Sequence, residues 1–118
     1  MKKNKILLFF LVLWLIPALC VAHVGMLNST PAKNGIVSSP PEKVTMKFGG
    51  KVEPAFSKIE VFDQYNNKVS KKTRFLKENI IMETDLKDKL PPGVYTVKWK
   101  CMSIDGHSLK GEYTFTIE

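Results

Sequence analysis

The most constraining feature of this sequence is a series of short apolar runs, separated by turn residues, throughout the part that follows residue 22. Such runs, rich in β-branched and aromatic residues, are typical of strands, and none of them repeats with the 3.6-residue period of an amphipathic helix. The clearest runs are residues 44–48, 59–62, 80–82, 94–99 and 113–117. Gly, Pro or Asn lies between them, where the chain must reverse. We therefore expect an all-β fold with roughly seven short strands: one small antiparallel β-sandwich of immunoglobulin-like or Greek-key type.

The first 22 residues have the pattern of a secretory signal peptide. Three lysines precede an unbroken apolar run at residues 6–16, and Pro17 and small residues follow, ending at Ala22. The run is shorter than the roughly 20 apolar residues of a membrane-spanning helix. A lipoprotein acylated at Cys20 is the alternative, but Leu19 is larger than the residue usual before such a cysteine. We expect cleavage after Ala22, which makes 1–22 the signal peptide, 23–118 the single domain and His23 the first residue of the exported chain.

Removal of the signal peptide changes the charge and the cysteine count. Residues 23–118 carry 15 basic and 11 acidic side chains, a net charge of +4, and Arg74 is the only arginine. Recognition of phosphates or bases favours the forked guanidinium of arginine, so we expect no nucleic-acid partner. Cys101 is then the only cysteine, so no intramolecular disulfide can form. We interpret it as a small buried side chain rather than a metal ligand or a reactive thiol.

Alternation within the runs predicts which side chains face the core. The expected core consists of Leu27, Val44, Met46, Phe48, Phe56, Ile59, Val61, Val97, Trp99, Phe115 and Ile117.

The sequence has two histidines, His23 and His107, and both lie in contexts that suit a metal. An N-terminal histidine offers its α-amine and its imidazole Nδ1 as a six-membered chelate, and the amine pKa of about 8 lets a metal displace the proton near neutral pH. His107 follows Asp105 and Gly106, where a tight turn can place a carboxylate and an imidazole on one side. Nitrogen and oxygen donors of this kind suit Cu(II). The alternative is that Asp-Gly-His is an ordinary turn, and a metal site requires the N-terminus to lie against it.

The sequence resembles the CopC family of periplasmic copper-binding proteins. The resemblance rests on three stretches in order: residues 23–35, which begin with His23; residues 52–57; and residues 90–99 with 103–111, which contain the Asp-Gly-His turn. It implies a small cupredoxin-like β-barrel that binds one Cu(II) per chain. His23 would bind through its amine and Nδ1, Asp105 through its carboxylate and His107 through its imidazole. We expect a monomer, with a separate membrane copper transporter as its partner.

Two departures from the family pattern limit the transfer. Many members carry an acidic residue two positions after the Phe of the second strand, where this chain has Gly50; Glu53 is the candidate substitute. Some members bind Cu(I) through a methionine-rich loop, but the methionines here are scattered, so we expect no Cu(I) site. Because the chain ends at Glu118, we also expect no fused transporter domain.

The predicted function is therefore that of an exported copper-binding protein for sequestration, delivery or resistance, without catalytic activity. It would be periplasmic in a host with two membranes, and released or held at the cell surface in a host with one. One alternative is a copper-dependent oxidase or oxygenase that uses the N-terminal histidine. The other is a metal-free β-sandwich interaction module that works through an exposed edge strand.

Overall fold

Eight strands and one short 3-10 helix make up residues 25–118, the part of the chain that this computed structural model describes. The predicted signal peptide and His23 lie outside the described residues. The elements are β1 (Met26–Thr30), β2 (Ile36–Val37), β3 (Lys43–Phe48), η1 (Pro54–Phe56), β4 (Lys58–Phe62), β5 (Ser70–Leu76), β6 (Ile81–Leu86), β7 (Gly93–Met102) and β8 (Ser108–Ile117). No helix within residues 25–118 has the length and apolar character needed to cross a membrane.

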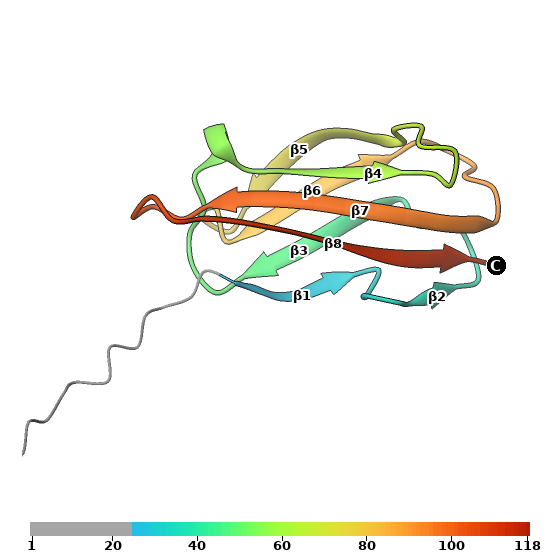
Figure 1. Ribbon diagram of the computed structural model, residues 1–118, viewed down its shortest axis with the longest axis horizontal. Helices are drawn as coiled ribbons and strands as arrows, with labels where there is room; N and C mark the ends of the chain where they lie inside the picture. Colours follow the sequence, from blue (N-terminus) through green and yellow to red (C-terminus); the bar gives the residue numbers. More distant parts are fainter. Residues whose placement is uncertain (1–24) are drawn as a thin grey trace, which may run out of the picture.

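The strands form two four-stranded sheets that pack face to face (Figure 1). One sheet has the order β1-β3-β6-β5 and the other the order β2-β8-β7-β4. The pairs are antiparallel except β2 with β8, where Ile36 lies opposite Thr116 in a parallel ladder. The chain changes sheets between β1 and β2, so that β2 borders β8 at the edge of the second sheet. The prediction of a small all-β sandwich is confirmed.

The strands that the sequence predicted are those with a buried face. The five runs lie within or overlap β3, β4, β6, β7 and β8. The sequence analysis missed β5, which has a sequence of mostly polar residues and lies at an edge of its sheet. It also missed β1 and β2, which expose most of their side chains. Edge strands bury less surface, so they need little of the apolar alternation that marks a strand.

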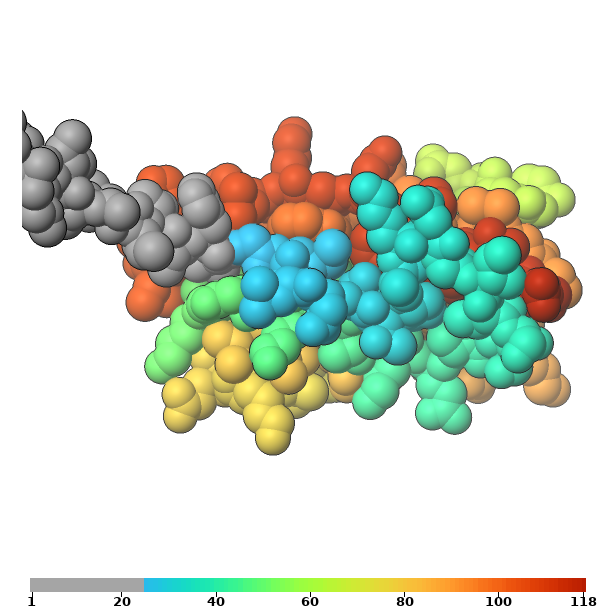
Figure 2. All heavy atoms as spheres, turned by 90° about the horizontal axis from the view of Figure 1, so that it is seen from below, coloured from blue at the N-terminus to red at the C-terminus, as the bar shows by residue number. Residues whose placement is uncertain are grey.

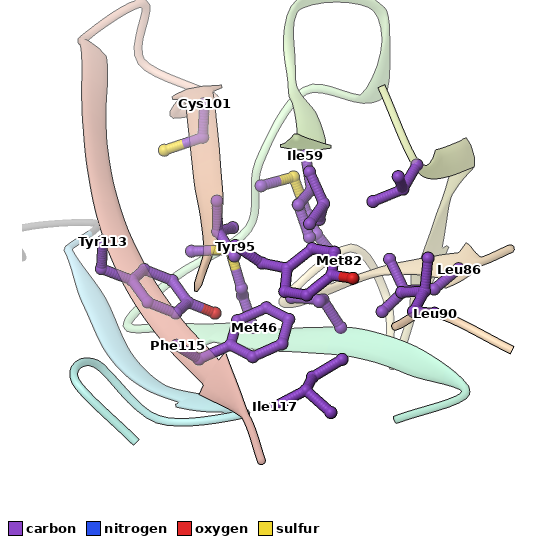
Figure 3. Close-up of a cluster of buried hydrophobic side chains, with 14 of the residues drawn as sticks. Met46, Ile59, Met82, Leu86, Leu90, Tyr95, Cys101, Tyr113, Phe115 and Ile117 are labelled. Carbon is purple, nitrogen blue, oxygen red and sulfur yellow. The ribbon is translucent and has the colours of Figure 1, made fainter. Parts of the chain in front are cut away.

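The core lies between the two sheets and is built from alternate residues of the central strands (Figure 3). Most of the predicted core residues are buried there: Val44, Met46, Phe48, Ile59, Val61, Val97, Phe115 and Ile117. Cys101 is also buried, as expected. Trp99 is partly buried and packs against this cluster, with its ring centroid 5.6 Å from that of Phe48 in an edge-to-face contact. Because Phe48 belongs to β3 and Trp99 to β7, this contact joins the two sheets.

Two core predictions are wrong. Leu27 is 63% exposed because the pairing of β1 with β3 shifts register between Met26 and Asn28, which turns the side chain of Leu27 away from the core. Met26 packs against the core instead. Phe56 is 58% exposed because it ends η1, a short helix that buries none of its residues.

The outer face of the β1-β3-β6-β5 sheet carries a network of ion pairs centred on Glu83, which is almost fully buried. Arg74 approaches Glu83 to 2.5 Å and Asp85 to 2.6 Å, and Lys43 lies 3.3 Å from Glu83. The Thr45 hydroxyl donates a 2.9 Å hydrogen bond to the same carboxylate. The hydrogen bonds from Arg74 lower the pKa of both Glu83 and Asp85, so both carboxylates stay charged well into the acid range.

Candidate metal centre

The turn between β7 and β8 contains the predicted ligands Asp105 and His107. The backbone N–H of Ser103 donates to the carbonyl of His107 at 2.8 Å, and the N–H of Gly106 donates to the carbonyl of Ser103 at 2.9 Å. Gly106 has a φ of 92°, in the region that L side chains rarely adopt, so glycine is strongly favoured there. These bonds close a five-residue loop and bring the side chains of Asp105 and His107 together.

Within this turn a carboxylate oxygen of Asp105, Oδ2, lies 3.0 Å from Nδ1 of His107. Both side chains are open to solvent, with exposed fractions of 61% for Asp105 and 75% for His107. The hydroxyl of Ser103 donates to the other oxygen of Asp105, and the backbone N–H of His107 donates to it at 3.3 Å. The Ser103 hydroxyl makes the largest contribution to lowering the pKa of Asp105. The pair therefore presents a charged carboxylate next to an imidazole whose Nε2 makes no hydrogen bond to residues 25–118.

Ser103 is a positioning residue that the sequence analysis did not select. It is only 3% exposed, and its hydroxyl oxygen also accepts the backbone N–H of His107 at 3.2 Å. It thus contacts both members of the pair from beneath the turn. The sequence signal for this role is a serine two residues before an aspartate in a glycine-containing turn. Serine and aspartate side chains in such turns form hydrogen bonds with nearby backbone groups.

Residues 52–57 pair with the two residues that lead into this turn. Val52 forms a β-bridge with Ser103, and the N–H of Glu53 donates to the carbonyl of Met102 at 2.7 Å. The hydroxyl of Ser57 accepts the N–H of Met102 at 3.1 Å. The second of the three stretches that resemble the CopC family therefore supports the turn through its backbone and Ser57.

The described residues supply only part of a metal site. Within residues 25–118, no three His, Cys, Asp or Glu side chains come together as a metal-binding group, so neither Glu53 nor Cys101 joins Asp105 and His107. Burial raises the pKa of Cys101, which keeps its side chain as a thiol at neutral pH rather than the thiolate that binds metals. A four-coordinate ion bound at the turn would need further donors. The predicted donor, His23, lies outside the described residues.

The first strand begins at the end of the sandwich that carries this turn. In Figure 1 the start of β1 and the loop between β7 and β8 lie at the same end, and Figure 2 shows this from the β1 edge. Met26 pairs with Phe48, and the N–H of Gly49 donates to the carbonyl of Gly25 at 3.0 Å. The chain thus enters the fold at a fixed point on the same end as Asp105 and His107.

The model of the CopC domain matches residues 26–118. The chain belongs to the CopC family. Its relatives include the copper transport protein CutJ of Bacillus subtilis, which is 37% identical over 122 residues. That alignment covers 99% of this chain but only 22% of CutJ, so the chain spans about a fifth of that longer protein. Protein YobA of Escherichia coli is 34% identical over 101 residues, which cover 82% of this chain and 80% of YobA.

Solved structures of the CopC family have the same fold. The crystal structure of CopC from Methylosinus trichosporium OB3b superimposes with a TM-score of 0.75 at 31% identity, covering 81% of this chain and 94% of that one. PcoC of Escherichia coli, described as a methionine-rich copper resistance protein, gives a TM-score of 0.72 at 27% identity, covering 82% and 100%. In this chain Met46 and Met82 are fully buried in the core, so neither is placed to bind an ion at the surface.

Proposed function

We propose that the exported chain, beginning at His23, binds one Cu(II) ion through His23, Asp105 and His107. The observation that carries this proposal is the Asp105–His107 pair, joined at 3.0 Å on an exposed turn at the end where β1 begins. His23 would contribute its amine and Nδ1, Asp105 a carboxylate oxygen and His107 a ring nitrogen. Copper is the cargo of this site.

The chemistry of the donors supports copper over other divalent ions. Imidazole, amine and carboxylate donors suit Cu(II), which heads the affinity order of the first-row divalent ions for such ligands. Asp105 is charged at neutral pH, and hydrogen bonds lower its pKa further, so no proton must leave it before a metal binds. The family and the copper-related names of CutJ and PcoC support the same choice.

Chain length supports a contribution from His23. It precedes Met26 by three residues, and three extended residues span at most about 10 Å. Met26 is paired with Phe48 at the end of the sandwich that carries the turn, which supports a proposed N-terminal chelate on the same end as Asp105 and His107. An exported chain with additional residues before His23 would lose the amine of the chelate.

An exposed copper site fits storage and transfer. Asp105 and His107 are both solvent-accessible, so a partner can approach the ion without unfolding the sandwich. We propose that the protein is monomeric, acts in the periplasm or at the outer surface of the cell membrane, and either sequesters copper or passes it to a membrane copper transporter. CutJ, a transport protein in which the matching region is about a fifth of the chain, is consistent with such a pairing.

The test measures the thermal stability of the exported protein with and without one equivalent of Cu(II). A ligand that binds only the folded state stabilises it, so copper should raise the melting temperature. His107→Ala and Asp105→Asn should each remove most of this increase. Asp88→Asn, in an exposed loop between β6 and β7, is the matched control and should keep it. An unchanged melting curve for the parent protein, or an equal loss in the control, would contradict the proposal.

A further inference from the structure

Three lysines stand directly opposite one another on the outer face of the β2-β8-β7-β4 sheet. Lys58 on β4 pairs with Lys100 on β7, and Lys100 pairs with Lys110 on β8. Directly opposite residues have Cβ atoms about 4.5–5.5 Å apart, and like charges in such positions destabilise a sheet. All three side chains are exposed, and within residues 25–118 neither Lys100 nor Lys110 has an ion pair. The row of three like charges therefore lowers the stability of this sheet.

The surrounding charges neutralise only Lys58 of this row. In the neighbouring row Lys98 lies between Glu60 and Glu112, and Glu60 is already paired with Lys58 at 2.9 Å and with Lys68 at 3.4 Å. We define the lysine face as Lys58, Lys68, Lys98, Lys100, Lys110, Glu60 and Glu112. Its net charge is +3, out of +4 for residues 23–118. Most of the net charge of the exported chain thus lies on one side of one sheet.

On the other sheet, side chains of opposite charge lie in register. On the outer face of β1-β3-β6-β5, Lys43 lies opposite Asp85 and Arg74 lies opposite Glu83. Opposite charges in register stabilise a sheet. Because these pairs follow the rule and the row of three lysines breaks it, the lysine row is not a general consequence of a lysine-rich composition.

A hollow lies within the lysine face. It has a volume of about 410 Å³ and is lined by Trp99 and Gly111, together with the lysine and glutamate side chains around them. Trp99 alternates with Lys98 and Lys100 along β7, so its indole lies on the opposite side of the sheet, against Phe48. Strand backbone therefore forms the floor of the hollow, and a side chain of a bound segment can enter it while neighbouring charged groups reach the lysines.

We propose that the lysine face docks an acidic segment of a partner protein, with its carboxylates on the lysine row. Charge complementarity favours this partner. The face lies on β7 and β8, the strands that carry the Asp105–His107 turn, so docking there places the partner beside that turn. The proposal does not depend on copper binding.

The glutamates of the lysine face favour an acidic protein over an anionic membrane. A membrane surface presents a uniform negative charge, which attracts the lysines but repels Glu60 and Glu112 in the adjacent row. A protein segment can place its carboxylates on the row of three lysines alone.

The experiment uses the exported protein and a synthetic heptaglutamate peptide that carries a fluorescein label. The fluorescence anisotropy of the label reports binding. We expect saturable binding at low ionic strength that weakens as salt screens the charges. Lys100→Glu, at the centre of the row, should weaken binding by about fivefold or more. Its melting temperature should rise or stay the same, because the substitution creates opposite-charge neighbours.

The matched control is Lys47→Glu, the same charge change on the outer face of the other sheet, opposite Asn28 and Ile81. It should leave peptide binding within about twofold of the parent protein. The proposal is overturned if the parent protein does not bind the peptide, or if Lys47→Glu weakens binding as much as Lys100→Glu. It is also overturned if Lys100 matters for binding to vesicles of phosphatidylglycerol and phosphatidylcholine but not to the peptide.

Discussion

Oδ2 of Asp105 lies 3.0 Å from Nδ1 of His107, and the hydroxyl of Ser103 donates to the other oxygen of the same carboxylate. The three side chains form a short chain of hydrogen bonds that starts at a buried serine and ends at an exposed imidazole. The carboxylate holds one ring nitrogen of His107 and thereby fixes the orientation of the ring. Partners of this kind control how well a histidine binds a metal.

Replacing Ser103 by alanine tests whether this hydroxyl positions the pair. Ser103→Ala removes the main hydrogen bond that lowers the pKa of Asp105, so this pKa should rise toward its ordinary value. Copper affinity should fall by about 10–100-fold, as is typical when a group that orients a ligand is lost. Competition against a copper chelator, measured across a pH series, checks this.

Two further variants separate positioning from simple damage to the fold. Ser103→Thr keeps a hydroxyl and should recover most of the affinity. Ser108→Ala, at the exposed start of β8, should bind copper as the parent protein does. If Ser103→Ala binds copper normally, the hydroxyl has no positioning role.

The Arg74 network predicts how stability depends on pH. Arg74 lowers the pKa of Glu83 and Asp85 below their usual values of 4.5 and 3.8. A carboxylate whose pKa is lower in the folded state contributes stability above its unfolded pKa and loses it as the pH falls through its folded pKa. The free energy of unfolding should therefore be steady from pH 7 to about pH 5 and fall below about pH 4.

Arg74→Gln removes the cause of both shifts. The variant should be less stable than the parent protein at pH 7, and the difference should shrink as the pH falls toward 3. Urea denaturation at a series of pH values measures this, with Lys72→Gln as the control for the loss of one positive charge. A difference that stays constant with pH would show that the network does not stabilise the fold through these carboxylates.

Gly111 permits the close approach of Trp99 to β8. A Cβ at this position would lie 2.7 Å from Cζ2 and 2.9 Å from Cε2 of the indole, closer than side chains pack. Gly111→Ala should therefore displace Trp99 and lower the free energy of unfolding by about 1–3 kcal/mol. Denaturant unfolding followed by tryptophan emission measures both effects. Gly25→Ala meets no atom within 4 Å and should leave the emission spectrum unchanged; an unchanged spectrum for Gly111→Ala would contradict the packing described here.

The sequence predicted the central part of the fold because the strands there bury one face. Val44, Met46 and Phe48 alternate with polar residues, and all three are buried. It did not predict β5, in which lysines, a threonine and an arginine follow Ser70. This strand forms because of its position at the edge of the sheet, and its sequence lacks apolar alternation. It also placed Leu27 in the core, because a register shift within β1 leaves no mark on the sequence.

The candidate site was predictable only in part. Asp105 and His107 are two residues apart, so a tight turn was enough to suggest that they meet. Ser103 was missed because its role depends on burial beneath the turn, which only the paired strands create. The role of His23 depends on cleavage and on a contact between distant parts of the chain, and neither follows from local patterns.

The most direct test of the copper proposal is native mass spectrometry of the protein recovered after export, with one equivalent of Cu(II). We expect the mass of residues 23–118 plus a single copper ion, and the same chain without copper for His107→Ala. A chain that begins at a residue other than His23, or a His107→Ala protein that retains its copper, would contradict it.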